Sequence, residues 1–215
     1  MATVAVIDYG MGNLHSIAKA LKTVSPESDV MITAGKKFIL SANYVVFPGV
    51  GAIRDCMHTL TKSGLDETIR EVASKGTPLL AICIGMQALL EHSEENGGID
   101  CLGVLPGKVV KFATNLTDND NKKLKIPHIG WNKVNYIYNK PLFINIEQNE
   151  RFYFVHSYHS SEVGNNNTIA TCNYPNSFPC ALKWENIVAV QFHPEKSQRA
   201  GLQLLKNFLN WDGKS

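Results

Sequence analysis

Residues 80–87 read Leu-Ala-Ile-Cys-Ile-Gly-Met-Gln, an apolar run that meets a helical pattern at a single cysteine. The run predicts a buried strand over residues 78–82, because short apolar segments bounded by turn residues are typical of strands covered on both faces. Residues 86–91 follow with the composition of a helix. Cys83 is therefore predicted to lie at a sharp corner between a strand and a helix.

This corner gives Cys83 surroundings that suit a nucleophile. Ala81 and Gly85 flank it two positions away on each side, and bulkier residues there would clash in a tight turn. The positive end of the helix dipole favours a thiolate, and the backbone N–H of Ile84 can point at an oxyanion formed on an attacked carbonyl. The same residues also fit a buried core cysteine between two isoleucines, because free cysteines are commonly buried. The corner alone leaves both interpretations open.

The rest of the chain indicates the sheet to which this corner belongs. Apolar strands are predicted at residues 3–7, 45–47, 78–82 and 187–192, and helices at residues 14–21, 65–75, 86–91 and 202–209. Shorter, often alternating segments lie at residues 109–112, 151–155, 168–171 and 181–184. No linker divides the chain, so we expect one α/β domain over residues 1–215. It has a central, mostly parallel sheet flanked by helices and an added antiparallel sheet in the second half.

The composition argues against several classes of protein. The 215 residues carry a net charge of +2, and the densest basic run (Lys122, Lys123 and Lys125) lies in a segment, 114–125, predicted to be an exposed, mobile loop. A nucleic-acid partner is therefore not expected. No stretch approaches the ~18 apolar residues of a membrane helix, and the N-terminus lacks the leader of a secretion signal. Five irregularly spaced cysteines favour reduced thiols and a cytoplasmic location.

A second chemical pattern is His193-Pro194-Glu195, directly after the last apolar strand. Residues two apart on an extended chain point to the same side, so Glu195 can accept a hydrogen bond from one imidazole nitrogen while the other faces a nucleophile. Pro194 is expected to keep the segment from coiling into a helix. A surface pair or half of a metal site would show the same pattern, but further zinc ligands at short spacing are absent from the sequence nearby. No metal or cofactor is therefore expected.

The two patterns together resemble class I glutamine amidotransferases, in which the cysteine and the His-Pro-Glu segment occur in this order and spacing. More narrowly, the chain resembles the glutaminase subunits of imidazole glycerol phosphate synthase, from histidine biosynthesis. The motifs that carry this likeness are Asp-Tyr-Gly-Met-Gly-Asn-Leu-His-Ser at 8–16, Phe-Pro-Gly-Val-Gly at 47–51, His-Ile-Gly-Trp-Asn at 128–132, Tyr-Phe-Val-His-Ser-Tyr at 153–158 and Gln-Phe-His-Pro-Glu-Lys-Ser at 191–197. They span nearly the whole chain. Ala81 departs from the family, which commonly has glycine there, and adds one methyl group to a tight crossing.

The resemblance implies a catalytic triad of Cys83, His193 and Glu195. The thiolate attacks the side-chain amide of L-glutamine and forms a γ-glutamyl thioester, and water then releases L-glutamate. His193 protonates the departing ammonia and activates the water, while Glu195 orients the imidazole.

The resemblance also implies an oxyanion hole formed by the backbone N–H groups of Ile84 and Val50. Gly49 and Gly51 permit backbone angles closed to other residues, so the Gly49–Val50 peptide is expected to turn its N–H into or out of the site. A simple tight turn would have the same sequence. The implied substrate-binding residues are Gln87, Gly51, Ser157 and Tyr158.

Ammonia released into solvent is protonated and lost, so the family pairs this subunit with a cyclase of the (β/α)₈-barrel type. By this likeness the chain forms a heterodimer in which ammonia is channelled to the barrel, which makes imidazole glycerol phosphate and AICAR. Asn13 and Lys196 match positions at the partner interface, although both also fit ordinary polar surface.

Three alternatives stay open at this point. A paralogue that supplies ammonia to another synthase, such as one that amidates a surface sugar, would share every glutaminase residue. A non-catalytic scaffold would not need the triad, and a cysteine peptidase would not need Gln87, Ser157 or Tyr158.

Overall fold

A nine-stranded mixed sheet forms the centre of the computed structural model, which describes residues 1–117, 121–137 and 141–214. Its strand order is β2-β1-β3-β4-β13-β12-β11-β8-β9. The parallel strands are β2 (Asp29–Thr33), β1 (Thr3–Ile7), β3 (Tyr44–Gly49), β4 (Leu79–Cys83) and β13 (Ile187–Val190). Every residue of β4 and β13 is buried, as expected for apolar strands covered on both faces.

The sheet continues in antiparallel fashion beyond β13. These strands are β12 (Ser177–Trp184), β11 (Thr168–Asn173), β8 (His128–Tyr136) and β9 (Arg151–His156). Alternation sets which side chains enter the core: Phe152, Phe154 and His156 of β9 are buried, and the residues between them are partly exposed.

A smaller, four-stranded sheet packs beside the large one, in the order β10-β7-β5-β6. Its strands are β10 (Tyr158–Ser161), β7 (Lys108–Lys111), β5 (His92–Ser93) and β6 (Ile99–Asp100). Only Ser157 separates β9 of the large sheet from β10 of the small one. The two sheets therefore share a corner at this residue.

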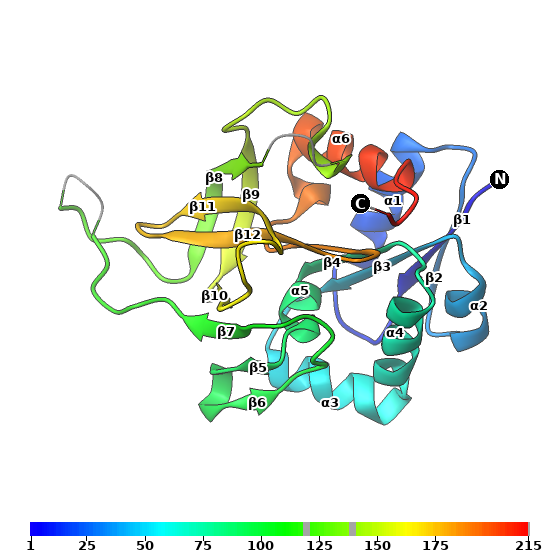
Figure 1. The fold of residues 1–215 in the computed structure, drawn as a ribbon, viewed down its shortest axis with the longest axis horizontal. Helices are drawn as coiled ribbons and strands as arrows, with labels where there is room; N and C mark the ends of the chain where they lie inside the picture. The colour runs from blue at the N-terminus through cyan, green and yellow to red at the C-terminus, as the bar shows by residue number, and fades with distance from the viewer. Residues whose placement is uncertain (118–120, 138–140, 215) are drawn as a thin grey trace.

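Helices cover both faces of the large sheet. Figure 1 shows α1 (Leu14–Val24) and α6 (Gln198–Leu209) together on one side, and α3 (Ile53–Ser63), α4 (Leu65–Ser74) and α5 (Ile84–Leu89) on the other. The remaining helices are α2 (Lys36–Ser41), next to α4, and the short 3₁₀ helices η1 (Glu95–Gly97), η2 (Pro141–Phe143) and η3 (Pro194–Lys196). Gly64 ends α3 and begins α4 with a positive φ of 67°, a conformation that favours glycine.

The predicted α/β fold is confirmed. The antiparallel strands of the second half extend the parallel sheet, so the large sheet is mixed. The predicted strand 187–192 ends at Val190, and the helix after Cys83 begins directly at Ile84. Within the predicted loop 114–125, residues 118–120 lie outside the described residues, and Thr117 and Lys123 on either side form an antiparallel bridge.

Among the described residues, no helix is long and apolar enough to cross a membrane.

Candidate active site

Cys83 is the last residue of β4 and caps the N-terminus of α5. Its backbone angles, φ 56° and ψ −110°, are unusual for a residue with a side chain, and its exposed fraction is 4%. A methyl group on Gly85 would collide with the carbonyl oxygen of Phe47 in β3, so the first turn of α5 packs directly on that strand's backbone. Ala81 is fully buried within the same crossing. The predicted strand–helix corner is present at Cys83.

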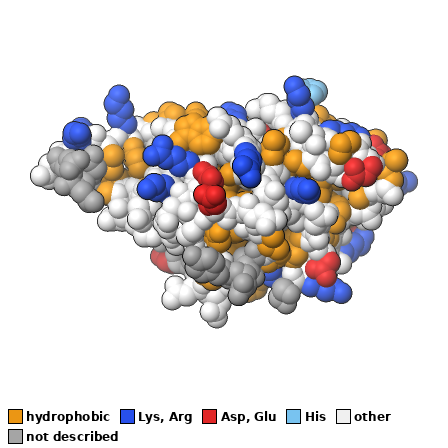
Figure 2. Space-filling model, turned by 90° about the horizontal axis from the view of Figure 1, so that it is seen from above, with side chains coloured by type: hydrophobic (Ala, Val, Ile, Leu, Met, Phe, Trp, Pro, Cys, Tyr) orange, Lys and Arg blue, Asp and Glu red, His pale blue; other side chains and the backbone are white. Residues whose placement is uncertain are grey.

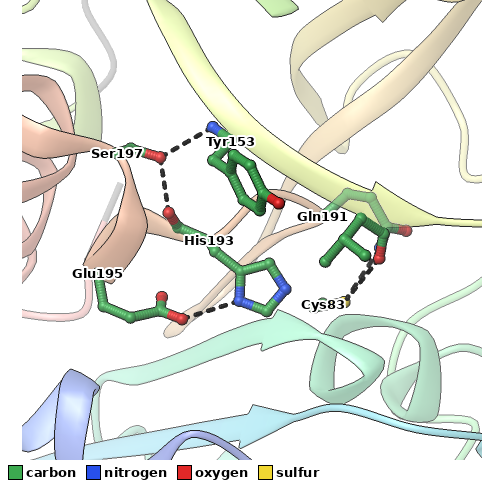
Figure 3. A network of polar contacts seen from close by, with 7 residues as sticks. Cys83, Tyr153, Gln191, His193, Glu195 and Ser197 are labelled. Carbon is green, nitrogen blue, oxygen red and sulfur yellow. Dashed lines mark hydrogen bonds and ion pairs between the residues drawn. The ribbon is translucent and has the colours of Figure 1, made fainter. Parts of the chain in front are cut away.

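His193 and Glu195 form a buried pair beside this corner. Nδ1 of His193 lies 2.8 Å from Oε1 of Glu195, and their side chains are 2% and 4% exposed. Figure 3 shows the imidazole between Glu195 and Cys83. One detail of the prediction was wrong: Pro194 does not prevent a helix but begins η3, because proline at the first helical position gives up no hydrogen bond.

The protonation of His193 follows from its neighbours. Burial alone would lower its pKa, but the Cys83 thiol and the Glu195 carboxylate outweigh this effect and raise the pKa to about 10. Nε2 of His193 has no hydrogen-bond partner among the described residues. The histidine is therefore charged at neutral pH, with one N–H uncommitted.

The backbone around His193 is clamped by β9 and by the start of α6. The backbone N–H of His193 donates to the Tyr153 carbonyl at 2.9 Å. The Ser197 hydroxyl donates to the His193 carbonyl at 2.6 Å and accepts from the backbone N–H of Tyr153 at 3.0 Å (Figure 3). These bonds fix the position of the imidazole relative to Cys83.

Two glutamines link the cysteine to the neighbouring pocket wall. The Gln87 amide donates to the side-chain oxygen of Gln191 at 3.0 Å and to the Tyr158 carbonyl at 3.1 Å. Gln191 is fully buried, and because its oxygen is engaged by Gln87, its NH₂ faces the Cys83 sulfur at 3.7 Å. Sequence reasoning gave Gln191 no role, although it lies two residues before His193.

A cavity of about 260 Å³ opens over the cysteine and His193. Every predicted substrate-binding and oxyanion residue lines it: Val50, Gly51, Ile84, Gln87, Ser157 and Tyr158. The structure adds Glu95, the first residue of η1 between β5 and β6, which sequence reasoning missed. One carboxylate oxygen of Glu95 accepts from the backbone N–H of Ile53 at 3.1 Å, so the side chain is held in place. A carboxylate in such a cavity provides a site for a cation.

The glycine-rich segment lies next to the nucleophile because β3 pairs with β4, with Gly49 opposite Cys83. Gly51 has a φ of 98°, which a residue with a side chain rarely adopts. Val50 is 36% exposed at the cavity. This segment is placed to present a backbone N–H toward the cysteine.

The two predicted interface residues both lie near the His193–Glu195 pair. Asn13, at the start of α1, borders a small void together with Val50, His193 and Glu195. Lys196 is exposed, and its ammonium lies 5.8 Å from the centre of the Tyr153 ring.

A second set of buried histidines lies at the side of the cavity, and His156 is one of the residues that line it. His128 Nδ1 is 2.9 Å from His156 Nε2, and His156 Nδ1 is 2.8 Å from the Tyr158 carbonyl. The Asn132 amide lies 3.2 Å from His128 Nε2. Burial lowers the pKa of His128 to about 4 and that of His156 to about 3, so both rings are neutral at pH 7.

The other cysteines differ from Cys83. All five are free. Burial raises the pKa of Cys56, Cys101 and Cys172 to about 12, so these remain protonated thiols. Among the described residues, no group of three or more His, Cys, Asp or Glu side chains is placed to hold a metal ion.

A cysteine on a strand–helix corner, beside a buried His–Glu pair on a mixed α/β sheet, fits the class I glutamine amidotransferases. The chain belongs to this family: residues 5–211 match the family described as glutamine amidotransferase class-I. Within the class, the chain is a member of the HisH group of imidazole glycerol phosphate synthase subunits. The HisH subunit of Methylococcus capsulatus is 51% identical over 213 residues, 99% of this chain and 98% of that protein. That of Pseudomonas putida is 51% identical over 214 residues, the full length of both.

Solved structures agree on the fold. A glutamine amidotransferase of known crystal structure superimposes with a TM-score of 0.72 at 17% identity, covering 96% of this chain and 97% of that one. At this level of identity the likeness concerns the fold alone.

Proposed function

We propose that this HisH-family subunit hydrolyses L-glutamine to L-glutamate and ammonia through Cys83, His193 and Glu195. The observation that carries the proposal is the buried His193–Glu195 pair, 2.8 Å apart, beside a cysteine held at a positive φ on the strand–helix corner. A charged imidazole next to the thiol favours the thiolate, the form that attacks a carbonyl.

The reaction takes place in two halves. The Cys83 thiolate attacks the amide carbon of glutamine, and the resulting oxyanion accepts hydrogen bonds from the backbone N–H groups of Ile84 and Val50. The His193 Nε2–H protonates the leaving nitrogen, the C–N bond breaks, and ammonia departs from a γ-glutamyl thioester. The neutral imidazole then takes a proton from water, which attacks the thioester. Glutamate leaves, and thiolate and imidazolium are restored.

The cavity supplies the substrate contacts. Glu95 binds the α-ammonium group of glutamine, because it is the carboxylate that the cavity presents in the described chain. Gly51, Ser157 and Tyr158 hold the amino-acid end through their backbone groups, and Gln87 keeps Tyr158 in position by its bond to the carbonyl.

Ammonia passes to a cyclase subunit of the (β/α)₈-barrel type in a cytoplasmic heterodimer that makes imidazole glycerol phosphate and AICAR. The names of the 51% identical relatives support this partner over a synthase for another acceptor. The docking face includes Asn13 and a row of side chains in which Lys196 lies over Tyr153 and Tyr153 packs on Trp131. Ile129 and Trp131, 59% and 43% exposed, give this face apolar surface.

No nucleic-acid or membrane partner enters this proposal, nor does a cofactor. On the face shown in Figure 2, Lys and Arg side chains are scattered and do not form the continuous stripe typical of a nucleic-acid site. The whole of residues 1–215 acts as one amidotransferase domain.

Labelling by a glutamine analogue with an electrophilic carbon tests the site. The parent protein is expected to take up one label that glutamine blocks, and Cys83→Ala is expected to take up none. Cys101→Ala is the matched control, because it removes a partly exposed thiol away from the corner and should label like the parent. Glutamate release, measured with and without the barrel subunit, should be fast only in the complex. An unlabelled parent would contradict the triad, and equal rates with and without the barrel would contradict control by the partner.

A further inference from the structure

Three buried side-chain polar atoms lack a hydrogen-bond partner in the described chain: His193 Nε2, Glu195 Oε2 and the hydroxyl of Tyr9. The first two belong to the proposed triad, where an open position has a use. Buried polar groups are otherwise nearly always paired, because an unpaired one costs free energy. The Tyr9 hydroxyl therefore needs an explanation of its own.

Tyr9 is held firmly beside the catalytic corner. It follows β1 in a turn closed by a 2.9 Å hydrogen bond from the Gly10 N–H to the Asp8 carboxylate. Its ring packs edge-on against Phe47 of β3, with ring centres 5.7 Å apart, and the residue is 4% exposed. The position of the hydroxyl is thus set by rigid neighbours.

The Tyr9 hydroxyl lies against Gly49, in the segment 48–51 that is predicted to supply one N–H of the oxyanion hole. A Cβ atom placed on Gly49 would lie 2.5 Å from the Tyr9 oxygen and 2.9 Å from the backbone nitrogen of Gly85. The hydroxyl therefore sits between Gly49 and the start of α5. Burial raises its pKa, as do a weak contact with the Cys56 thiol and, to a smaller extent, Cys83, so the group stays protonated and is a hydrogen-bond donor.

The hydroxyl contacts Gly49 from outside the cavity lining. Val50 and Gly51 line the cavity, and Tyr9 is not among the described residues that do. In a trans peptide the N–H and the C=O point in opposite directions. Turning the Val50 N–H into the cavity therefore turns the Gly49 carbonyl toward the side where Tyr9 lies.

We propose that Tyr9 is a positioning residue of the oxyanion hole: its hydroxyl donates to the Gly49 carbonyl when the Val50 N–H turns inward. The inference rests on the proposed glutaminase function. In this structure the hydroxyl makes no such bond and has only the weak acceptor of the Cys56 thiol beside it, and we assign this state to the inactive orientation of the peptide. The hydrogen bond to the Gly49 carbonyl then stabilises the active orientation.

Tyr9→Phe tests this directly, because it removes one oxygen from a well-packed ring. In the complex with the barrel subunit, kcat for glutamate release is expected to fall about tenfold, the value of one neutral hydrogen bond, with KM within about twofold. The slow rate of the isolated chain should fall less than the activated rate, because the isolated chain spends less time in the active orientation. The urea midpoint of the isolated chain should stay the same or rise, because no bond is lost from the resting state.

Tyr136→Phe is the control, and its expected effects on stability and rate are the reverse of those of Tyr9→Phe. It removes a hydroxyl that donates to the Ile146 carbonyl at 2.5 Å, far along the chain from the site, and should lower the urea midpoint while leaving both rates unchanged. A Tyr9→Phe protein with the parent's activated rate would overturn the inference, as would one that loses the isolated and activated rates equally together with stability. In the first case the proposed function stands. A parent that releases no glutamate with the barrel would instead remove the proposed function and this inference together.

Discussion

His193 and the His128–His156 pair are buried to nearly the same degree, with exposed fractions of 2%, 3% and 6%, yet burial has opposite outcomes. His193 faces a carboxylate and a thiol, and its pKa rises to about 10. His128 and His156 face each other and a carbonyl, and their pKa values fall to about 4 and 3. Burial alone therefore does not predict the charge of a histidine; the groups that accept its hydrogens do.

The neutral pair has one consistent pattern of protons. The Tyr158 carbonyl can only accept, so His156 carries its hydrogen on Nδ1 and accepts at Nε2 from Nδ1–H of His128. Nε2 of His128 then accepts from the Asn132 amide. Each ring has one donor and one acceptor in use, which holds the corner between β9 and β10 that forms one cavity wall. The His193 site instead keeps a charged ring with one free N–H.

Glu195→Gln should have the largest effect, because it makes the His193 site resemble the neutral pair. An amide in place of the carboxylate loses the charge that holds the imidazolium, and we expect kcat for glutamate release to fall by about 10⁴ in the complex. Glu162→Gln is the control, since Glu162 pairs with Lys108 at the surface and should retain the parent rate. A loss below tenfold would mean that the thiol alone is enough to charge His193.

The second-largest expected effect is a loss of stability in acid, which charges the neutral His128–His156 pair. The folded pKa values of His128 and His156 lie below the unfolded value near 6.5, so the unfolded chain binds more protons as the pH falls from about 6.5 toward 4. The free energy of unfolding should then drop by up to about 1.4 kcal/mol per pH unit for each ring. His193 acts in the opposite sense: its contribution is present below pH 6.5 and is lost as the pH rises through about 10. Urea titrations between pH 7 and 5 measure the acid slope, and a flat profile would contradict neutral rings.

His128→Phe should have a smaller, purely structural effect. The ring stacks between Phe154 and Tyr174, with centres 4.9 and 3.9 Å away, so phenylalanine fits the stack. It leaves Nε2 of His156 without a donor, which should cost about 1–3 kcal/mol of stability. The acid slope should also fall to about half, while kcat stays within about threefold. A large loss of kcat at unchanged stability would show instead that His128, like His193, takes part in the reaction.

Asn132→Ala should have the smallest effect, because it removes only the outer end of the same chain of hydrogen bonds. The amide is partly exposed and donates at 2.9 Å to the Asn173 carbonyl as well as to His128. Water can replace these bonds, so we expect a loss of about 0.5–1.5 kcal/mol in urea unfolding and an unchanged kcat. A larger loss of stability than that of His128→Phe would contradict the positions assigned to the hydrogens on His128 and His156.

The sequence predicted the parts of the site whose chemistry is local. The corner at Cys83 follows from a buried strand that meets a helix within a few residues, and the His193–Glu195 pair follows from a spacing of two. The wrong detail, Pro194, came from treating proline only as a helix breaker, although it fits the first position of a helix.

What the sequence did not predict depends on strand register. His128 and His156 are directly opposite each other on β8 and β9. Strand β8 was not predicted, because Ile129 and Trp131 on its exposed face interrupt the alternation of apolar and polar residues. Glu95 reaches the cavity only through the small sheet. The contact of Tyr9 with Gly49 requires the order β1-β3-β4. Such pairings cannot be read from one strand at a time.

The position of β13 has a consequence for the order in which this enzyme is made. β13 lies between β4 and β12 in the middle of the sheet, yet the ribosome delivers it more than a hundred residues after β4. Until then the nascent chain carries Cys83 on an edge strand, and His193 on the segment after β13 has not been synthesised. In the proposed mechanism the growing chain thus has a nucleophile without a base, and it does not consume glutamine before the sheet closes around its last central strand.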